Sequence, residues 1–480
     1  MLAVGSLHCA TSPITPHDPR PNVLLVVTDD QSYPHASAYG TRWVKTPAFD
    51  RVARAGVRFD RAFVSAPSCA PSRASLLTGE AFYRLGSACV NHAAWPEGLL
   101  SVVDLLGESG YAAGSAGKGF GPGDWRGSGR SFSPTGPEAP GTGDVAERLR
   151  AFLDAKPSGA PFFFWIGFHE PHRPYEPGAG SADSPPPPPF LPDEPEVRRD
   201  LADYARAIES ADARLVRVLD LLDSRGVLDA TLVVVTSDNG MPFPGAKATL
   251  YDAGTRVPLA VRYGDRVSPG RAIDDFVSLT DLAPTILEAA GIEIPSRMTG
   301  RSLWPLLTAN RSGLVDRTRD AVVMGLERHA PGVRPDGAGY PMRAIRTAEY
   351  LYIRNLASAS SPSGDRPGIT WPADDPVGGF GDVDGSPTKT LLFQRRDRWP
   401  ALAGRVFDVR PDEELYRLSD DQDQLRNVAE HAELHGVRVE LARRLDAFLL
   451  ETRDPRALGR GAEFDAILKR FAPAPGSARR

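Results

Sequence analysis

Continuous apolar runs of strand-forming residues recur in the first two thirds of the chain. They occupy residues 22–27, 161–168 and 231–235, and a further strand-like run covers 258–263. A run that no polar residue interrupts is typical of a parallel strand buried on both faces. Helical periodicity lies between these runs, at 46–55, 101–109, 144–155, 201–223 and 281–290. Strands that alternate with helices predict an α/β domain with a mostly parallel central sheet.

The pattern changes after about residue 320. Short runs at 321–326, 342–346 and 350–354 predict antiparallel strands, and residues 437–450 form an amphipathic helical pattern. Residues 358–388 are rich in glycine and proline and are expected to be an insertion without regular structure. We therefore expect an N-terminal segment (1–20), a large α/β domain (21–320), a smaller α+β subdomain with an antiparallel sheet (321–456) and a tail (457–480).

Composition and charge exclude several classes of protein. The formal net charge is −5 over 480 residues, which argues against binding of nucleic acid through a basic face. No apolar run approaches the length of a membrane span. The three cysteines, Cys9, Cys69 and Cys89, are too few for a disulfide framework. The oligomeric state stays open at this point.

Two predicted strands end in groups of oxygen donors. Asp29 and Asp30 follow the first strand, and Asp238 and Asn239 follow the strand at 231–235. Each pair alone is typical of a solvated turn. Taken together, they lie where open α/β sheets bind ligands, at the carboxyl ends of strands. Four hard oxygen donors suit Ca²⁺ or Mg²⁺, and the set lacks the thiolates or imidazoles of a zinc site.

Cys69 precedes a predicted helix. Pro71 suits the first turn of a helix, and residues 74–77 continue the helical pattern. A cysteine at a helix N-terminus is placed as a nucleophile or as the precursor of one, because the helix dipole favours an anion there. The alternative is a small buried apolar residue.

The segment Cys69-Ala70-Pro71-Ser72-Arg73, followed by Leu76-Leu77-Thr78-Gly79, resembles the signature of formylglycine-dependent sulfatases. This resemblance implies the sandwich fold of the alkaline phosphatase superfamily. It implies that a formylglycine-generating enzyme oxidises Cys69 to an aldehyde, whose hydrate attacks sulfur. It also implies one bound Ca²⁺, preferred over Mg²⁺, a sulfated saccharide as substrate, and export to the periplasm or outside the cell.

The resemblance assigns roles residue by residue. Lys118, His172 and Lys247 would surround the sulfate, and Arg73 would hold the aldehyde hydrate. His172 or a nearby donor would protonate the leaving oxygen or nitrogen. The metal ligands would be Asp29, Asp30, Asp238 and Asn239.

One position departs from the family pattern. Relatives commonly have a histidine two residues after the lysine at 118, where this chain has Phe120. His92, His169 or a metal-ordered water are the candidates to replace it. The alternative is an inactive, glycan-binding member of the family.

Four stretches resemble the sulfamidases, or heparan N-sulfatases: residues 168–173, 237–244, 340–343 and 451–455. In that group an acid in the His-x-Pro-His segment and an aspartate near the end of the domain bind the terminal glucosamine, which implies this role for Glu170 and Asp454. Two features differ, because sulfamidases carry arginine at the position of Lys247 and lack the proline-rich stretch at 177–195. N-sulfoglucosamine is therefore the favoured substrate, and an O-sulfatase acting on a sulfated glycan is the alternative.

Overall fold

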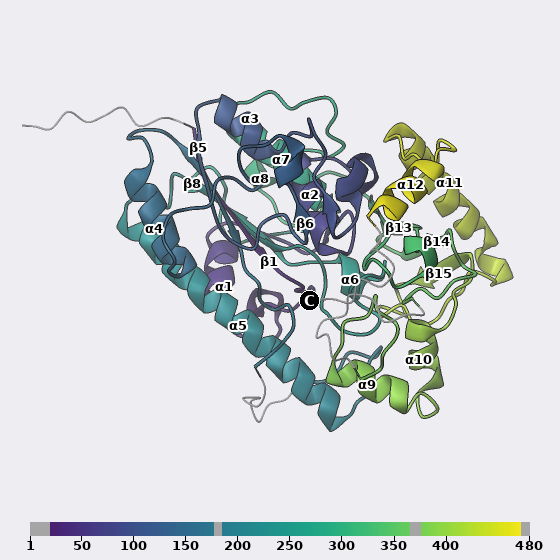
Figure 1. The fold of residues 1–480 in the computed structure, drawn as a ribbon. Helices are drawn as coiled ribbons and strands as arrows, with labels where there is room; N and C mark the ends of the chain where they lie inside the picture. Colours follow the sequence, from purple (N-terminus) through teal and green to yellow (C-terminus); the bar gives the residue numbers. More distant parts are fainter. Residues whose placement is uncertain (1–19, 177–184, 365–375, 472–480) are drawn as a thin grey trace, which may run out of the picture.

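The computed structural model describes residues 20–176, 185–364 and 376–471 (Figure 1). At its centre is a seven-stranded sheet with the order β10-β2-β9-β8-β1-β7-β5. The strand β1 (Asn22–Thr28) pairs in parallel with β7 (Phe162–Gly167) and β8 (Thr231–Ser237), and β5 (Ala112–Gly117) is parallel to β7. These four parallel strands confirm the predicted sheet.

The other side of the sheet is mixed. The strand β9 (Leu259–Arg262) is antiparallel to both β8 and β2 (Val57–Phe59), and β10 (Arg271–Ile273) is parallel to β2. Two short parallel pairs lie outside this sheet, namely β3 (Ala62–Phe63) with β11 (Val277–Ser278), and β4 (Ala93–Ala94) with β6 (Gly123–Asp124).

Helices cover both faces of the sheet (Figure 1). Along β1, Val23 and Leu25 join the core that contains α2 (Cys69–Thr78), α3 (Val102–Glu108), α7 (Leu282–Ala289) and α8 (Trp304–Thr308). Leu24 and Val26 join the opposite core, with α1 (Pro47–Arg54), α4 (Val145–Ala155) and α5 (Pro195–Ser224). Since alternate side chains of a strand face opposite sides, the uninterrupted apolar run of β1 is the expected consequence of two covering layers.

A second, antiparallel sheet follows. Its order is β12 (Ala321–Leu326), β13 (Met342–Thr347), β14 (Tyr350–Asn355) and β15 (Glu413–Arg417). The helix α11 (His435–Glu451) packs Leu441 and Leu445 against Ile345 and Tyr352 of this sheet. The helices α9 (Pro387–Gln394) and α10 (Pro400–Phe407) lie between the sheet and α5, and α6 (Asp252–Thr255) lies near the centre (Figure 1).

Some elements differ from the sequence-based expectation. The helix α5 begins at Pro195 instead of residue 201, because proline fits the first turn of a helix. After residue 456, where only a tail was expected, α12 (Ala462–Arg470) buries Phe464 and Leu468. The predicted N-terminal segment and part of the proline-rich stretch, residues 177–184, lie outside the described residues. Among the described helices, none combines the length and the apolar character needed to cross a bilayer.

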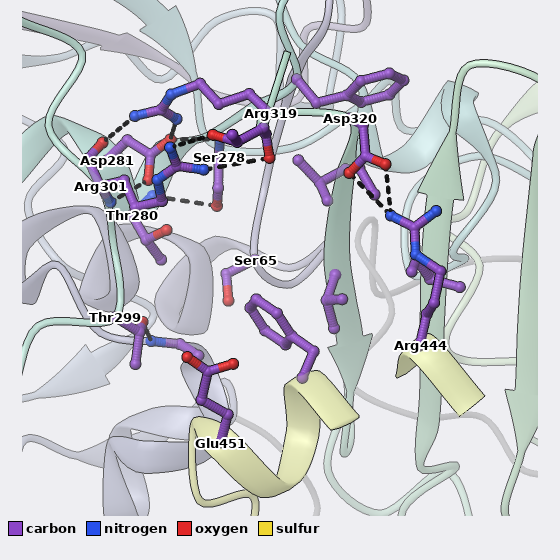
Figure 2. Close-up of a pocket in the computed structure, with 18 of the residues that line it drawn as sticks. Ser65, Ser278, Thr280, Asp281, Thr299, Arg301, Arg319, Asp320, Arg444 and Glu451 are labelled. Carbon is purple, nitrogen blue, oxygen red and sulfur yellow. Dashed lines mark hydrogen bonds and ion pairs between the residues drawn. The ribbon is translucent and has the colours of Figure 1, made fainter. Parts of the chain in front are cut away.

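A cavity of about 450 Å³ separates the large domain from α11 (Figure 2). Arg444 of α11 reaches across to Asp320, with 2.9 Å between guanidinium and carboxylate, and Arg319 pairs with Asp281 at 2.8 Å. None of the predicted site residues lines this cavity. The Arg444–Asp320 pair therefore joins α11 to the large domain, and the boundary near residue 320 remains a prediction.

A buried ion-pair network fixes the end of the C-terminal region. Arg343 of β13 pairs with Glu327 and with Asp454, each at 2.7 Å, and Arg456 also binds Glu327. The side chains of Glu327 and Asp454 are fully buried. Removing one member of such a network leaves an uncompensated buried charge.

We therefore expect Arg343→Met to lower the free energy of unfolding by about 3–5 kcal/mol, because the buried carboxylate of Asp454 loses its cation while Glu327 keeps only Arg456. The matched control is Arg444→Met, which breaks a pair whose side chains are 31% and 60% exposed; we expect it to cost less than about 1 kcal/mol. Urea denaturation of both variants measures the difference. Equal losses would contradict a structural role for the Arg343 network.

Candidate active site

The carboxyl ends of the four parallel strands meet at one edge of the sheet. Asp29 and Asp30 follow β1, Lys118 follows β5, His172 lies in the segment after β7, and Asp238 and Asn239 follow β8. The helix α2 brings Cys69 and Arg73 to the same edge, and Lys247 reaches it from the loop after β8. The structure therefore brings together all nine residues that were predicted to act on sulfate or to hold the metal.

The tips of β1 and β8 are tied together through Asp30. Its backbone has φ of +72°, a left-handed conformation that aspartate tolerates better than most residues. In this conformation the Asp30 amide donates to Asp238 Oδ1 (3.0 Å), and Asn239 Nδ2 donates to Asp30 Oδ1 (2.7 Å). The turn therefore directs carboxylates from two strands to one point.

Two glycines let the tips of β5 and β7 approach closely. Gly117 has φ of +78°, and a Cβ there would lie 2.1 Å from the carbonyl oxygen of Gly167. A Cβ on Gly167 would lie 1.7 Å from the carbonyl oxygen of Lys118. Only glycine fits such contacts. The approach places Lys118 Nζ 2.5 Å from Asp29 Oδ2.

The first turn of α2 is anchored to the carboxylates. Cys69 is its first residue, with Sγ 3.6 Å from Asp29 Oδ1. Arg73, one turn further, is completely buried and donates from Nε to Asp238 Oδ2 at 2.7 Å. A second nitrogen of its guanidinium donates to the carbonyl oxygen of Gly119. Arg73 thus holds the helix start and the lysine loop in one arrangement.

Asp384, a residue that sequence analysis did not identify, adds a further carboxylate to the site. Lys247 Nζ lies 2.7 Å from Asp30 Oδ2 and 3.2 Å from Asp384 Oδ2. Asp384 belongs to the glycine- and proline-rich insertion, whose composition carries no recognisable motif. His172 completes this side, with Nε2 3.9 Å from Asp30 Oδ2 and Nδ1 bonded to the carbonyl oxygen of Arg173.

The insertion holds Asp384 in a defined place. The carboxylate of Asp382 accepts hydrogen bonds from the Ala330 amide (2.8 Å) and from Arg334 (2.7 Å). The buried ammonium of Lys389 donates to the carbonyl oxygens of residues 379, 380 and 383. The loop that carries Asp384 is therefore anchored by hydrogen bonds on both sides of this residue, although its sequence predicted no regular structure.

The electrostatics favour charged cations and a neutral thiol. Burial opposes ionisation of Lys118 and Lys247, but Asp29 and Asp30 outweigh it and raise the pKa of both lysines. Burial raises the pKa of Asp30 to about 6 despite the opposing charge of Lys247. Burial also raises the pKa of Cys69 well above its usual value, so the unmodified side chain is a thiol and a weak nucleophile at neutral pH.

The donor set fits a hard divalent cation. Asn239 Oδ1 is buried and has no hydrogen-bond partner among the described residues. Ligand atoms of Asp29, Cys69 and Asp238 lie within 4.8 Å of one another. A buried orphan amide oxygen beside converging carboxylates is the arrangement that a cation with oxygen ligands satisfies.

Phe120 does not point into the site. It is 1% exposed and packs edge-on against Trp95, with 5.1 Å between ring centroids. A different histidine lies next to the cysteine segment, because His329 Nδ1 is 2.8 Å from Ser68 Oγ. Burial lowers the pKa of His329 to about 4, so its imidazole is neutral. Neither a motif nor a spacing in the sequence identified His329.

The two predicted sugar ligands are placed differently. The Glu170 carboxylate forms an ion pair with Arg214 of α5, and its backbone oxygen accepts a hydrogen bond from the Asp29 amide. Asp454 is buried in the Arg343 network. Among the described residues, no hydrogen bond or ion pair joins either carboxylate to the cluster of charges, and their contact with substrate stays a prediction.

This combination of fold and site defines a sulfate ester hydrolase with an alkaline phosphatase-like fold. The Sulfatase family model matches residues 21–292, and the chain belongs to the sulfatase family.

Relatives and solved structures agree with this assignment. The chain is 30% identical over 380 residues to human N-sulphoglucosamine sulphohydrolase, covering 70% of this chain and 73% of that protein. It is 27% identical over 432 residues to an ulvan-active sulfatase of Formosa agariphila, covering 88% and 78%. A protein solved in complex with its substrate D-glucosamine-2-N,6-O-disulfate has a TM-score of 0.65 at 20% identity, covering 91% of this chain and 98% of that one, which shows a shared fold.

The Asp384 contact gives a direct test. We expect Asp384→Asn to lower kcat/KM for an aryl sulfate by about 10- to 100-fold, because Lys247 loses one of the two carboxylates that position it. The control is Asp397→Asn, an exposed position after α9, for which we expect wild-type activity. A value for Asp384→Asn within twofold of the wild type would remove Asp384 from the site.

Proposed function

We propose that this sulfatase removes sulfate from a sulfated sugar and that N-sulfoglucosamine at the end of a chain is the favoured substrate. The observation that carries the proposal is the set of cations around Cys69, namely Lys118, Lys247 and Arg73. The sugar is supported by the similarity to human N-sulphoglucosamine sulphohydrolase, which spans 70% of the chain.

The cations are matched to a sulfuryl group in transfer. Negative charge develops on its outer oxygens, and preorganised cations stabilise that charge most effectively where water is excluded. Lys118 and Lys247 are 13% and 4% exposed at their side chains and keep their charge. Sulfate oxygens therefore replace part of the contact that these lysines make with Asp29 and Asp30.

A divalent cation, with Ca²⁺ preferred over Mg²⁺, would be held by Asp29, Asp30, Asp238 and Asn239. When bound, it supplies Lewis-acid polarisation of sulfate oxygens. The chain's own part is to keep the ligands in place, since Arg73 holds Asp238 and the Asp30 turn joins two strands.

Cys69 would serve after conversion to formylglycine by a modifying enzyme. Its high pKa as a thiol supports a role as a precursor over a role as a thiolate nucleophile. The imidazole of His329 lies beside Ser68 and is neutral, so its free ring nitrogen can accept a hydrogen bond or a proton in this segment, although burial makes it a weaker base than an exposed histidine. His329 would take the part of the histidine that Phe120 replaces, which supports an enzyme over an inactive glycan-binding protein.

His172 would donate the proton to the leaving nitrogen or oxygen. Burial and the charge of Lys247 lower its pKa, so the free enzyme holds a neutral ring. An arriving sulfate brings negative charge that favours the imidazolium, whose Nε2 proton is then available to the leaving group. The hydrogen bond from Nδ1 to the Arg173 carbonyl keeps Nε2 directed at the site.

An O-sulfatase on a sulfated glycan is the second candidate. It is favoured by Lys247, where sulfamidases carry arginine, and by the ulvan-active sulfatase that aligns with 88% of the chain. Export is proposed with either substrate, on the family likeness alone.

Cys69 should be found as formylglycine in active protein made together with a modifying enzyme. Tryptic mass spectrometry of the peptide that contains residue 69 measures the conversion, and Cys69→Ala should lower turnover by at least about 1000-fold. The variant keeps the helix start, because alanine is favourable there, so an unchanged unfolding midpoint is its control. A fully active sample with an unmodified cysteine would end this mechanism.

The substrate proposal predicts faster release of sulfate from glucosamine N-sulfate than from the 6-O- and 3-O-sulfates of N-acetylglucosamine. We expect kcat/KM to differ by at least about tenfold, because a site built for one polar arrangement rejects another. Ion chromatography of released sulfate measures all three reactions. Faster cleavage of either O-sulfate would favour the second candidate and leave the sulfatase assignment unchanged.

A further inference from the structure

A cavity of about 600 Å³ lies beside the catalytic cluster, between α5 and the insertion that carries α9. Its walls include Arg173 and Tyr175 from the segment after β7, Asp203 of α5, and Thr390, Gln394 and Arg395 at α9. Ligand pockets commonly have volumes of about 300–1,000 Å³, so this space can receive a sugar ring.

Two residues that line the cavity are next in sequence to residues of the sulfate site. Arg173 directly follows His172, and Gly385, another lining residue, directly follows Asp384. Tyr175 lines the cavity and packs against Arg173, whose guanidinium carbon lies 4.5 Å from the centre of the tyrosine ring. Burial raises the pKa of this tyrosine well above its usual value, and Asp30 of the catalytic cluster is among the charges that raise it further.

Tyr175 Oη is a polar atom without a partner. It is buried and makes no hydrogen bond with the described residues. A buried hydroxyl without a partner costs free energy, so such an atom indicates a missing hydrogen-bonding group. Because Tyr175 lines the cavity, a ligand in that space can supply this group.

The charges on the wall favour an anionic substituent at one end. The Asp200 carboxylate is neutralised by a bidentate pair with Arg173, at 2.6 and 2.8 Å, and Asp203 pairs with Arg206 at 2.5 Å. The third lining carboxylate, Glu196, is 42% exposed and faces Arg199 at 3.9 Å. The guanidinium of Arg395 is exposed and forms no ion pair or hydrogen bond within the part of the chain that the structure describes. Arg395 is therefore available to a carboxylate or sulfate of a ligand.

We propose that this cavity is a second saccharide subsite, which receives the sugar unit next to the one that loses sulfate. The proposal rests on the proposed function. The second unit carries an anionic group that pairs with Arg395, and its hydroxyls bond with Tyr175, Thr390 and Gln394. The enzyme therefore acts preferentially on the end of an oligosaccharide, because binding energy from the remote unit positions the reacting one.

The test compares a monosaccharide with a disaccharide that shares the same terminal sulfated sugar and carries a uronic acid as its second unit. We expect kcat/KM for the disaccharide to exceed that for the monosaccharide by at least about tenfold. In Thr390→Trp, which fills the cavity, and in Arg395→Ala, the ratio should fall toward one. Both substrates are measured on the same variant. A general loss of activity therefore lowers both kcat/KM values and leaves their ratio unchanged.

Two further variants provide a control outside the cavity and a test of the Tyr175 hydroxyl. Arg396→Ala removes a neighbouring exposed arginine that does not line the cavity, and its ratio should equal that of the wild type. Tyr175→Phe removes a hydroxyl without a protein partner, so thermal stability should be unchanged or higher while the ratio falls. A merely structural tyrosine would leave the ratio unchanged.

The outcomes separate the two proposals. A wild-type ratio near one, or the same high ratio in Thr390→Trp and Arg395→Ala, overturns the subsite and leaves the terminal sugar assignment standing. If glucosamine N-sulfate is not cleaved, the substrate assignment fails, and the same comparison with the sulfated sugar that is cleaved decides the subsite. A disaccharide advantage that persists with a neutral second sugar overturns the role of Arg395.

Discussion

The balance of buried charge at the carboxyl edge of the sheet is the constraint on which the site depends. Asp29, Asp30 and Asp238 are each at most 1% exposed. Carboxylates at that depth need cations close by, because burial strongly disfavours their ionised form. Arg73 and Lys118 supply two of these cations from segments that the chain brings together only on folding. The interactions that stabilise the edge in the free protein are also those that a sulfate and a divalent cation would use.

The C-terminal region contributes to this balance from a distance. Asp384 shares Lys247 with Asp30, so the ammonium is held between two carboxylates from different parts of the fold. Its loop is fixed by the buried ammonium of Lys389. The Arg343 network anchors Glu327, which lies two residues before His329, and Asp454 near the end of the C-terminal region. The C-terminal region therefore supplies a counter-charge and structural support to the carboxyl edge of the central sheet.

The packing around Phe120 accounts for an apolar residue at the position where the family resemblance implies a histidine. Phe120 is part of the apolar core with Trp95, where a histidine would be desolvated. The neutral imidazole of His329 lies beside Ser68, the residue that precedes Cys69. The insertion that supplies Asp384 also leads into α9, which forms one wall of the cavity beside the site.

The sequence by itself determined the parallel strands, the antiparallel sheet after residue 320, and the strand-end clusters around Asp29 and Asp238. These follow from uninterrupted apolar runs and from motifs of adjacent residues, which are local properties. Only the tertiary structure decided the partners of Asp384, His329 and Asp454. Asp384 lies 137 positions from Lys247, and His329 lies 261 positions from Ser68. No local pattern encodes such contacts, because packing of separate elements creates them. The same packing placed Asp454 in an ion pair that its sequence motif could not reveal.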